Sequence, residues 1–155
     1  MTAPQPNCLA PIILRPAGPL DCERVWNWNF DPQVRERSRT RERVSMERHA
    51  LWYAQRLDAS RGPMWIIEES SRPVGVVRID ADGGNAGRIS IALAAEARGR
   101  GIGRRAVAVA CQVWGQSVVA EIRIDNYPSR SCFQACDFRG VAMRDGLVTY
   151  RWEGK

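Results

Sequence analysis

The chain has 155 residues, the usual size of a single domain, and a formal net charge of +6 from 23 basic and 17 acidic residues. Its five cysteines are odd in number and lack paired spacing, which excludes a secreted disulfide framework, and a single histidine leaves a zinc site short of ligands. The amino end does not read as a signal peptide and no apolar run approaches the roughly 20 residues that span a bilayer, so we expect a cytoplasmic protein with no metal and no membrane partner.

Taken in chain order, residues 1–10 are expected to form a flexible N-terminus and residues 11–155 a single domain. The domain opens with a β-rich run at 12–16. A helix follows, with Asp21 as an acid of its first turn, and runs towards Trp28. This opening indicates a strand followed by a helix.

Residues 35–43 hold five arginines and no apolar side chain. The simpler interpretation is a solvated connector, and the alternative is a flexible basic lip over a ligand site. Ser45 then begins a second helix, whose apolar positions extend to Leu57. We expect the two helices to pair as a lid.

Three β-rich runs at 64–67, 74–80 and 88–93 are separated by short breaks, which predicts three consecutive antiparallel strands. The segment from 102 to about 116 carries an apolar stripe at helical spacing, of the kind that covers a sheet. Residues 118–124 alternate as a strand, and a right-handed crossover would place this strand parallel to 88–93.

The chain ends with a short helix that opens at Pro128, followed by strands at 138–143 and 147–152 that form a hairpin around the turn 144–146. This order of elements predicts an α+β fold with a mixed central sheet of about seven strands and about four helices.

The segment 98–104 is the most informative stretch, because it lies between a predicted strand and a predicted helix and has glycine at 99, 101 and 103. Glycine permits positive φ and close approach of a ligand to the backbone, and the amides that open a helix bind phosphate. The spacing does not fit a dinucleotide fingerprint, and a P-loop is excluded because the only lysine is Lys155. An arginine-rich helix start is the structural alternative.

The pattern Arg98-x-x-Gly101-x-Gly103 resembles the loop that binds the acetyl-CoA pyrophosphate in the GNAT acyltransferase superfamily. The predicted order of elements is also that of the GNAT fold. The resemblance therefore implies acetyl-CoA as co-substrate, with the backbone of the strand before the loop pairing with the pantetheine arm. The residues that it implies for CoA binding are Ile91, Ala92, Leu93, Arg98, Gly99, Arg100, Gly101, Ile102, Gly103, Arg104, Asn126, Ser129 and Phe133.

A second family pattern follows the fifth strand, and here Asn126, Ser129 and Phe138 match it. Phe133 stands where the family often has the tyrosine that protonates the departing thiolate, and Asp137 where it has glycine. Tyr127, Ser129 or Ser131 are the hydroxyls that would replace this acid, unless water serves.

The position of the usual catalytic glutamate on the fourth strand is taken by Arg88, which cannot accept a proton. The general base is therefore unassigned, with Ser90 as a holder of water and Asp80 as a nearby carboxylate. A strand amide near Leu93 would polarise the thioester carbonyl.

The first third of the chain, which includes the run Trp28-Asn29-Phe30-Asp31-Pro32, is similar to acetyltransferases of nucleotide-linked amino sugars and to those of protein amino termini. Trp28, His49 and Arg78 are the residues expected to contact the acceptor, Arg78 by meeting a diphosphate. Structural roles for Trp28 in the core and for His49 on a lid helix are the alternatives.

Together these features predict an N-acetyltransferase that moves acetyl directly from acetyl-CoA to a primary amine, preferably on a nucleotide-linked amino sugar. A protein amino terminus or a small amine is the alternative acceptor, and a CoA-binding regulator without activity is the alternative function. Nucleic acid is not expected as a partner, because the common RNA-binding motifs are missing from the sequence. We expect a monomer or homodimer.

Overall fold

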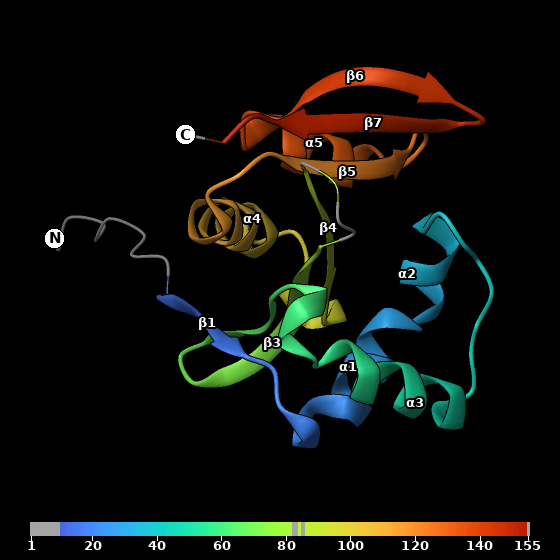
Figure 1. The fold of residues 1–155 in the computed structure, drawn as a ribbon, viewed down its shortest axis with the longest axis vertical. Coiled ribbons are helices and arrows are strands. Elements are labelled where there is room, and N and C mark those ends of the chain that lie inside the picture. The colour runs from blue at the N-terminus through green and yellow to red at the C-terminus, as the bar shows by residue number, and fades with distance from the viewer. Residues whose placement is uncertain (1–9, 82–83, 85, 155) are drawn as a thin grey trace, which may run out of the picture.

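The computed structural model describes residues 10–81, 84 and 86–154, and its centre is one mixed seven-stranded sheet (Figure 1). In spatial order the strands are β1 (Ile12–Pro16), β2 (Met64–Glu69), β3 (Arg72–Asp80), β4 (Gly87–Leu93), β5 (Val118–Arg123), β7 (Leu147–Trp152) and β6 (Arg139–Arg144). The helices are α1 (Cys22–Asn29), α2 (Pro32–Arg37), α3 (Met46–Arg56), α4 (Ile102–Trp114) and α5 (Tyr127–Ala135). Three short 3₁₀ turns are η1 (Pro19–Asp21), η2 (Ala59–Arg61) and η3 (Ala95–Ala97). The predicted α+β fold, the order of its elements along the chain and the parallel pairing of 118–124 with 88–93 are confirmed.

Helices cover both faces of the sheet (Figure 1). On one face, the apolar stripe of α4 buries Ala106, Val107 and Ala110 completely against the central strands. On the other face, α1 and α3 pack through Val25 and Tyr53 onto a second cluster of strand residues. Because side chains alternate along a strand, β2, β3 and β4 each contribute to both clusters.

The helix α2 differs from the sequence expectation, because residues 35–43 are not a connector throughout. Asp31 caps this helix by accepting hydrogen bonds from the amides of Gln33 and Val34, and Pro32 follows at the first helical position. The first part of the arginine-rich run is therefore helical. The remainder, from Ser38, passes beside the cavity described below.

Asp21 is also placed differently, since it ends the 3₁₀ turn η1 and is buried, with only 3 % of its surface exposed. Arg15 donates two hydrogen bonds to its carboxylate, at 2.9 and 3.0 Å, and Arg24 donates a third at 2.8 Å. The Gly18 amide donates a fourth at 2.9 Å. Asp21 thus joins β1 to the first helix as a buried ionic link rather than as a helix-dipole partner.

Candidate functional site

Strands β4 and β5 separate almost as soon as they pair. Their parallel pairing is limited to Gly87 with Val118 and Arg88 with Val119, beyond which the strands diverge (Figure 1). The divergence leaves a gap between the β1–β4 half of the sheet and the half formed by β5, β7 and β6. Backbone groups on the edges of such a gap are available to a ligand.

The backbone groups of β4 that face the gap follow from the hydrogen bond at its start. The Gly87 amide points towards β5 and donates to the carbonyl oxygen of Ser117 at 2.9 Å. Because the direction of the amides alternates along a strand, those of Ile91 and Leu93 also point to the gap, whereas the backbone of Ala92 faces β3. Ile91 and Leu93 therefore offer the free amides that the sequence analysis expected, and Ala92 contributes its side chain to the cavity wall.

The glycine-rich loop lies at one end of the gap and leads into α4. Gly99 and Gly101 adopt φ values of 74° and 79°, and nothing lies within 4 Å of where a Cβ would be. Gly103 belongs to α4 with ordinary helical backbone, and an added Cβ would sit 3.6 Å from Cδ1 of Leu93. Positive φ, which glycine permits, is thus used at two of the three glycines. The open cradle at the start of α4 fits a pyrophosphate.

Arg98 fastens this loop to β4 and α2. Its Nη2 donates to the carbonyl oxygen of Leu93 at 3.0 Å, and its Nη1 donates to Oε1 of Gln33 at 2.7 Å. It also forms an ion pair with Asp31 at 3.3 Å. The guanidinium therefore holds the loop in place and still lines the smaller of two cavities.

The other loop residues separate into two groups. Arg104 lines the smaller cavity. Arg100 instead pairs with Glu69 at 2.7 Å on β2 and lines neither cavity, and the side chain of Ile102 is buried in the core. The side chains of these two residues are thus engaged away from the cavities, and their expected contact with CoA stays a prediction for their backbone amides.

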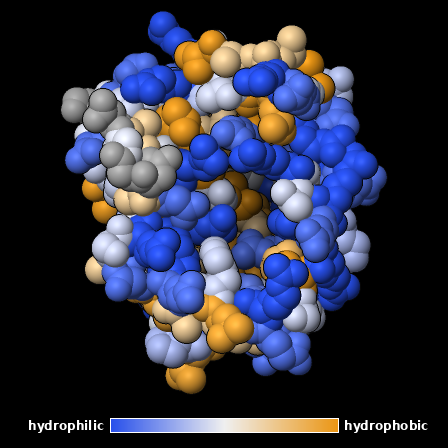
Figure 2. All heavy atoms as spheres, turned by 45° about the vertical axis from the view of Figure 1, so that its right-hand side comes forward, coloured by the Kyte–Doolittle hydropathy of each residue, from blue (hydrophilic) through white to orange (hydrophobic). Residues whose placement is uncertain are grey.

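Two cavities meet at the gap. The larger has a volume of about 510 Å³ and lies on the α1 and α3 side, and the smaller has a volume of about 370 Å³ and lies beside the glycine-rich loop. Figure 2 shows a hollow in this face with a hydrophilic rim and hydrophobic residues deeper inside. The residues that line both cavities are Val34, Arg37, Ser38, Ile91, Ala92, Asn126 and Ser129. The shared walls allow one ligand to approach another through the gap.

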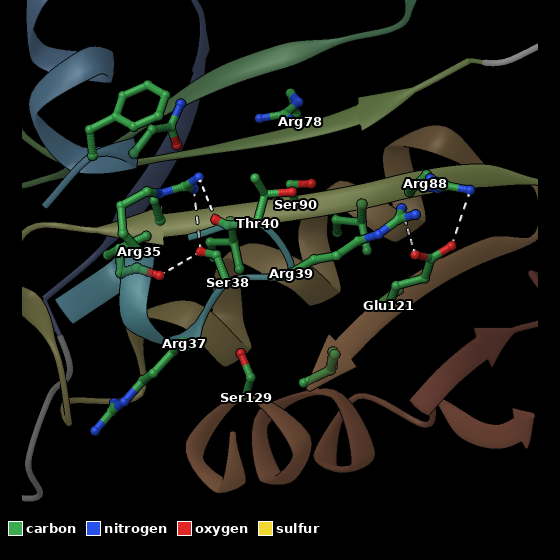
Figure 3. A pocket seen from close by; sticks show the side chains of 18 of the residues that line it. Arg35, Arg37, Ser38, Arg39, Thr40, Arg78, Arg88, Ser90, Glu121 and Ser129 are labelled. Atoms are coloured by element: carbon green, nitrogen blue, oxygen red, sulfur yellow. Dashed lines mark hydrogen bonds and ion pairs between the residues drawn. The ribbon is translucent and has the colours of Figure 1, made fainter. Parts of the chain in front are cut away.

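The larger cavity has six arginines in its lining and a single carboxylate, Glu121 on β5. Two guanidiniums hold this carboxylate, with Arg39 at 2.8 Å and Arg88 at 3.2 Å (Figure 3). Sequence analysis did not identify Glu121 as a site residue. The parallel alignment of β4 and β5 would have identified Glu121, because this alignment places Ser90 and Glu121 on the same face across the gap.

Asp80, the carboxylate proposed from the sequence as a nearby acid, is engaged outside the cavity lining. Arg56 is buried and donates to Oδ1 of Asp80 at 2.8 Å, and Arg78 donates to the same oxygen at 3.2 Å. Arg78 itself lines the larger cavity, and its guanidinium lies 5.2 Å from the ring centre of Trp52. Asp80 therefore orients Arg78 and is committed to two cations.

The residues at α5 that were predicted to belong to the site differ in their position relative to the two cavities. Ser129 lines both cavities, its amide donates to Oδ1 of Asn126 at 3.3 Å, and its hydroxyl points into the cavity (Figure 3). Phe133 is buried and forms part of the wall of the larger cavity. Tyr127 is 68 % exposed and lines neither cavity, and Ser131 lines the smaller one. Of the three hydroxyls predicted to replace the tyrosine, Ser129 is therefore the one that lines both cavities.

The two acceptor residues predicted on the lid also differ in position. His49 lines the larger cavity but is buried, and its Nε2 lies 3.0 Å from the carbonyl oxygen of Cys22. Burial lowers the pKa of His49, which keeps the ring neutral and Nε2 as the donor. Trp28 packs against the core and lines neither cavity.

Comparison with known families identifies the chain. The model of the acetyltransferase (GNAT) domain matches residues 12–139, which include the separated strands, the loop and α5. The chain belongs to the GNAT acetyltransferase family. It is an acetyl-CoA-dependent N-acetyltransferase, and the cradle at the start of α4 fits the pyrophosphate of its co-substrate. A search of curated proteins finds no matching sequence.

Solved GNAT structures share the fold at low sequence identity. A domain from Methanocaldococcus jannaschii is 22 % identical, with a TM-score of 0.80 over 93 % of this chain and 99 % of that one. Spermidine N-acetyltransferase from Vibrio cholerae, in complex with CoA and spermine, is 13 % identical, with a TM-score of 0.80 over 92 % and 95 %. The yncA protein of Salmonella typhimurium, solved with its cofactor acetyl-CoA, is 17 % identical, with a TM-score of 0.76 over 93 % and 94 %. In the described part of our GNAT chain, no helix has the length and apolar character needed to cross a membrane.

Proposed function

We propose that this GNAT enzyme acetylates the primary amine of a small molecule that occupies the larger cavity, while acetyl-CoA lies along the gap and the loop. The supporting observation is the junction between the two cavities, which share Ile91, Ala92 and Ser129 as wall residues. An amine and a thioester held on either side of this junction would react directly within one complex. The volume of the larger cavity, about 510 Å³, is within the usual range for small-molecule sites.

Glu121 is the residue to which we assign the amine. A primary amine is an ammonium ion at neutral pH and has to lose a proton before it can attack a carbonyl carbon. Glu121 is the only carboxylate among the described residues that line the larger cavity. Its carboxylate would bind the ammonium group and accept the proton, directly or through a water held by Ser90.

The acyl group would be activated by the chain's own backbone. Acetyl-CoA supplies the acetyl group as a thioester, whose carbonyl oxygen needs a hydrogen-bond donor during the reaction. The amides of Ile91 and Leu93 point into the gap and are suited to this role. The hydroxyl of Ser129, which lines both cavities, would donate a proton to the departing thiolate in place of a tyrosine.

The preferred acceptor remains a nucleotide-linked amino sugar, with a protein amino terminus as the alternative. The observation in favour of the sugar is the aromatic and cationic lining of the larger cavity, where Arg78 stacks on Trp52. Rings of this kind stack on sugar or base faces, and arginine binds phosphate.

The test combines turnover with product identification. The purified enzyme is incubated with acetyl-CoA and either a UDP-linked amino sugar, the free amino sugar, a peptide with a free amino terminus, or spermidine. Release of the CoA thiol is followed by a thiol reagent, and the acetylated product is identified by mass spectrometry. Turnover of the UDP-linked sugar is expected, and turnover of peptides alone would refute the sugar assignment.

A further inference from the structure

The larger cavity contains more cationic groups than its carboxylate can balance. Glu121 is already paired with Arg39 and Arg88. Among the described residues, the buried side-chain nitrogen and oxygen atoms without any hydrogen-bond partner are Nε of Arg35 and Nε of Arg88. Arg88 has a carboxylate partner, whereas Arg35, Arg37 and Arg48 have none within the described chain. Arg37 and Arg48 are exposed to solvent, so Arg35 is the half-buried cation that lacks a counterion.

Arg35 is nevertheless held in a defined position. Its Nη1 donates to the carbonyl oxygen of Thr40 at 3.0 Å, its Nη2 donates to Oγ of Ser38 at 3.3 Å, and its guanidinium lies 4.7 Å from the ring centre of Phe30 (Figure 3). These are neutral partners. They orient the guanidinium towards the cavity without cancelling its charge.

Arg78 is a second guanidinium near the first. It projects from β3 into the same cavity and stacks on Trp52. Its one carboxylate partner, Asp80, is shared with the buried Arg56. Both guanidiniums line the same cavity. Burial lowers the pKa of Arg35, and the positive charge of Arg78 lowers it further. Two fixed cations that repel each other form a receptor for an anion.

The geometry points to an acceptor that carries an oxyanion, either a carboxylate or a phosphate, and we propose that Arg35 and Arg78 bind this group. The inference rests on the proposed function, because it takes the amine of the acceptor to lie at Glu121. Figure 3 shows Arg35 towards one end of the cavity and Glu121 towards the other, with Arg78 between them on the β3 side. An acceptor with an ammonium group at one end and an oxyanion at the other matches both ends.

A single segment of the chain connects the two ends. Residues 38–40 hold Arg35 through Ser38 and Thr40, and the same segment places Arg39 against Glu121 at 2.8 Å. The segment is anchored to the other half of the sheet by Asn126, whose Nδ2 donates to the carbonyl oxygen of Arg37 at 3.3 Å. The distance between the oxyanion and the amine of the acceptor is therefore set by the protein.

The proposed oxyanion site distinguishes this enzyme from acetyltransferases whose acceptors are polycations. The Vibrio cholerae structure contains spermine, which carries several positive charges and no negative one. In our cavity six arginines face one glutamate, and such a lining repels a polycation while it attracts an anion.

A binding experiment tests the arginine pair directly. The enzyme is first saturated with CoA, so that the glycine-rich loop is occupied, and is then titrated with inorganic phosphate or with acetate in a calorimeter at constant ionic strength. Saturable binding of at least one anion is expected, with the preferred one identifying phosphate or carboxylate. Arg35→Met and Arg78→Met should each weaken this binding by roughly tenfold or more. Arg144→Met, which removes a 92 % exposed arginine of β6, is the matched control and should bind as the wild type does.

A turnover experiment uses three aminoethyl compounds that differ in their anionic group, together with the polycation spermidine. Ethanolamine, phosphoethanolamine, β-alanine and spermidine are compared by kcat/KM in the wild type, Arg35→Met and Arg35→Lys, with folding checked by circular dichroism. An anionic amine should be preferred, Arg35→Met should remove the preference, and Arg35→Lys should retain part of it. A preference for ethanolamine or spermidine that Arg35→Met leaves unchanged would overturn the inference and leave the proposed function intact. If no amine is acetylated, the proposed function fails, while the phosphate and acetate titrations still decide whether the arginine pair binds an anion.

Discussion

Arg88 on β4 and Glu121 on β5 form an ion pair across the point where the two strands separate, with Nη2 of Arg88 3.2 Å from Oε1 of Glu121. In many GNAT enzymes the position of Arg88 carries the catalytic glutamate. Here the carboxylate lies on the adjoining strand, beside the same gap. The pair therefore keeps a carboxylate beside the gap, in the wall of the larger cavity, although the strand that provides it has changed.

The first prediction concerns Glu121→Gln. The substitution preserves the shape of the side chain but removes the group that binds the ammonium and accepts its proton. We expect kcat/KM to fall by about 10²-fold or more. Acetyl-CoA affinity, measured by calorimetry, should change little, because Glu121 lines only the larger cavity.

The matched control for this variant is Glu153→Gln. Glu153 pairs with Arg151 near the end of the chain, and its side chain is 74 % exposed. An exposed pair of this kind contributes little, so activity and its pH profile should be unchanged. If Glu121→Gln were as active as Glu153→Gln, the assignment of the amine to Glu121 would be wrong.

The second prediction compares two glycine-to-alanine changes in the loop. Gly101→Ala places a Cβ on a residue with a φ of 79°, which costs about 1 to 2 kcal/mol for an L-residue and should weaken acetyl-CoA binding by about 5 to 30-fold. Gly103→Ala adds the same methyl group to helical backbone with its nearest neighbour 3.6 Å away, so affinity should be nearly retained. Calorimetric titration with acetyl-CoA measures both. Equal losses in the two variants would contradict the assignment of the left-handed turn to the loop's function.

Patterns that depend on local physics were predictable from the sequence. The alternating runs gave strands with the observed order, and the turn of the terminal hairpin has positive φ at Asp145 and Gly146, as a tight two-residue turn requires. Ser45 caps its helix by accepting from the amide of Arg48, as the sequence indicates. The helix after Asp31 was not predicted, because Val34 is the single apolar side chain that it packs against the core and the apolar periodicity that marks a helix is missing.

The site itself was only partly predictable. The loop could be identified because the glycines that it needs lie within a few residues of one another. Glu121 and Arg35 could not, because each becomes a cavity residue only when β5 and α2 are placed beside β4, and no short motif records that placement. Trp28 was expected at the acceptor, but its spacing along α1 turns it towards the core. The roles of His49 and Tyr127 remain predictions.

The third prediction concerns the buried carboxylate of Asp21. Burial alone would raise its pKa, but the hydrogen bonds from Arg15 and Gly18 and the charges of Arg15 and Arg24 outweigh it, so the pKa is lowered. A lowered pKa means that the stabilisation is complete above the unfolded value of about 3.9 and is lost as the pH falls through the folded value. Asp21→Asn should therefore reduce the free energy of unfolding by about 2 kcal/mol at pH 7, measured by urea denaturation, and by less at pH 3.

Asp145→Asn is the control for that variant. Asp145 lies in the exposed hairpin turn with a φ of 53°, a conformation that asparagine also adopts, and its ion pair with Arg144 is exposed. The stability of this variant should match the wild type at both pH values. A loss at Asp21→Asn that does not shrink in acid would show that the effect comes from packing rather than from charge.

The fourth prediction concerns the pH dependence of stability that His49, the single histidine of the chain, produces. His49 is buried against Tyr53, and burial lowers its pKa although the Cys22 carbonyl oxygen opposes the shift. Below the unfolded value of about 6.5 the unfolded chain takes up a proton that the folded chain resists, so stability is complete above that pH and declines as the pH falls towards the folded value. The urea midpoint of the wild type should therefore be lower at pH 5.5 than at pH 7.5.

His49→Gln retains a donor for Cys22 but cannot titrate, and its midpoint should be less dependent on pH over this interval, even if the variant is less stable throughout. Parallel pH profiles for the two proteins would mean that the ring is not buried in its neutral form.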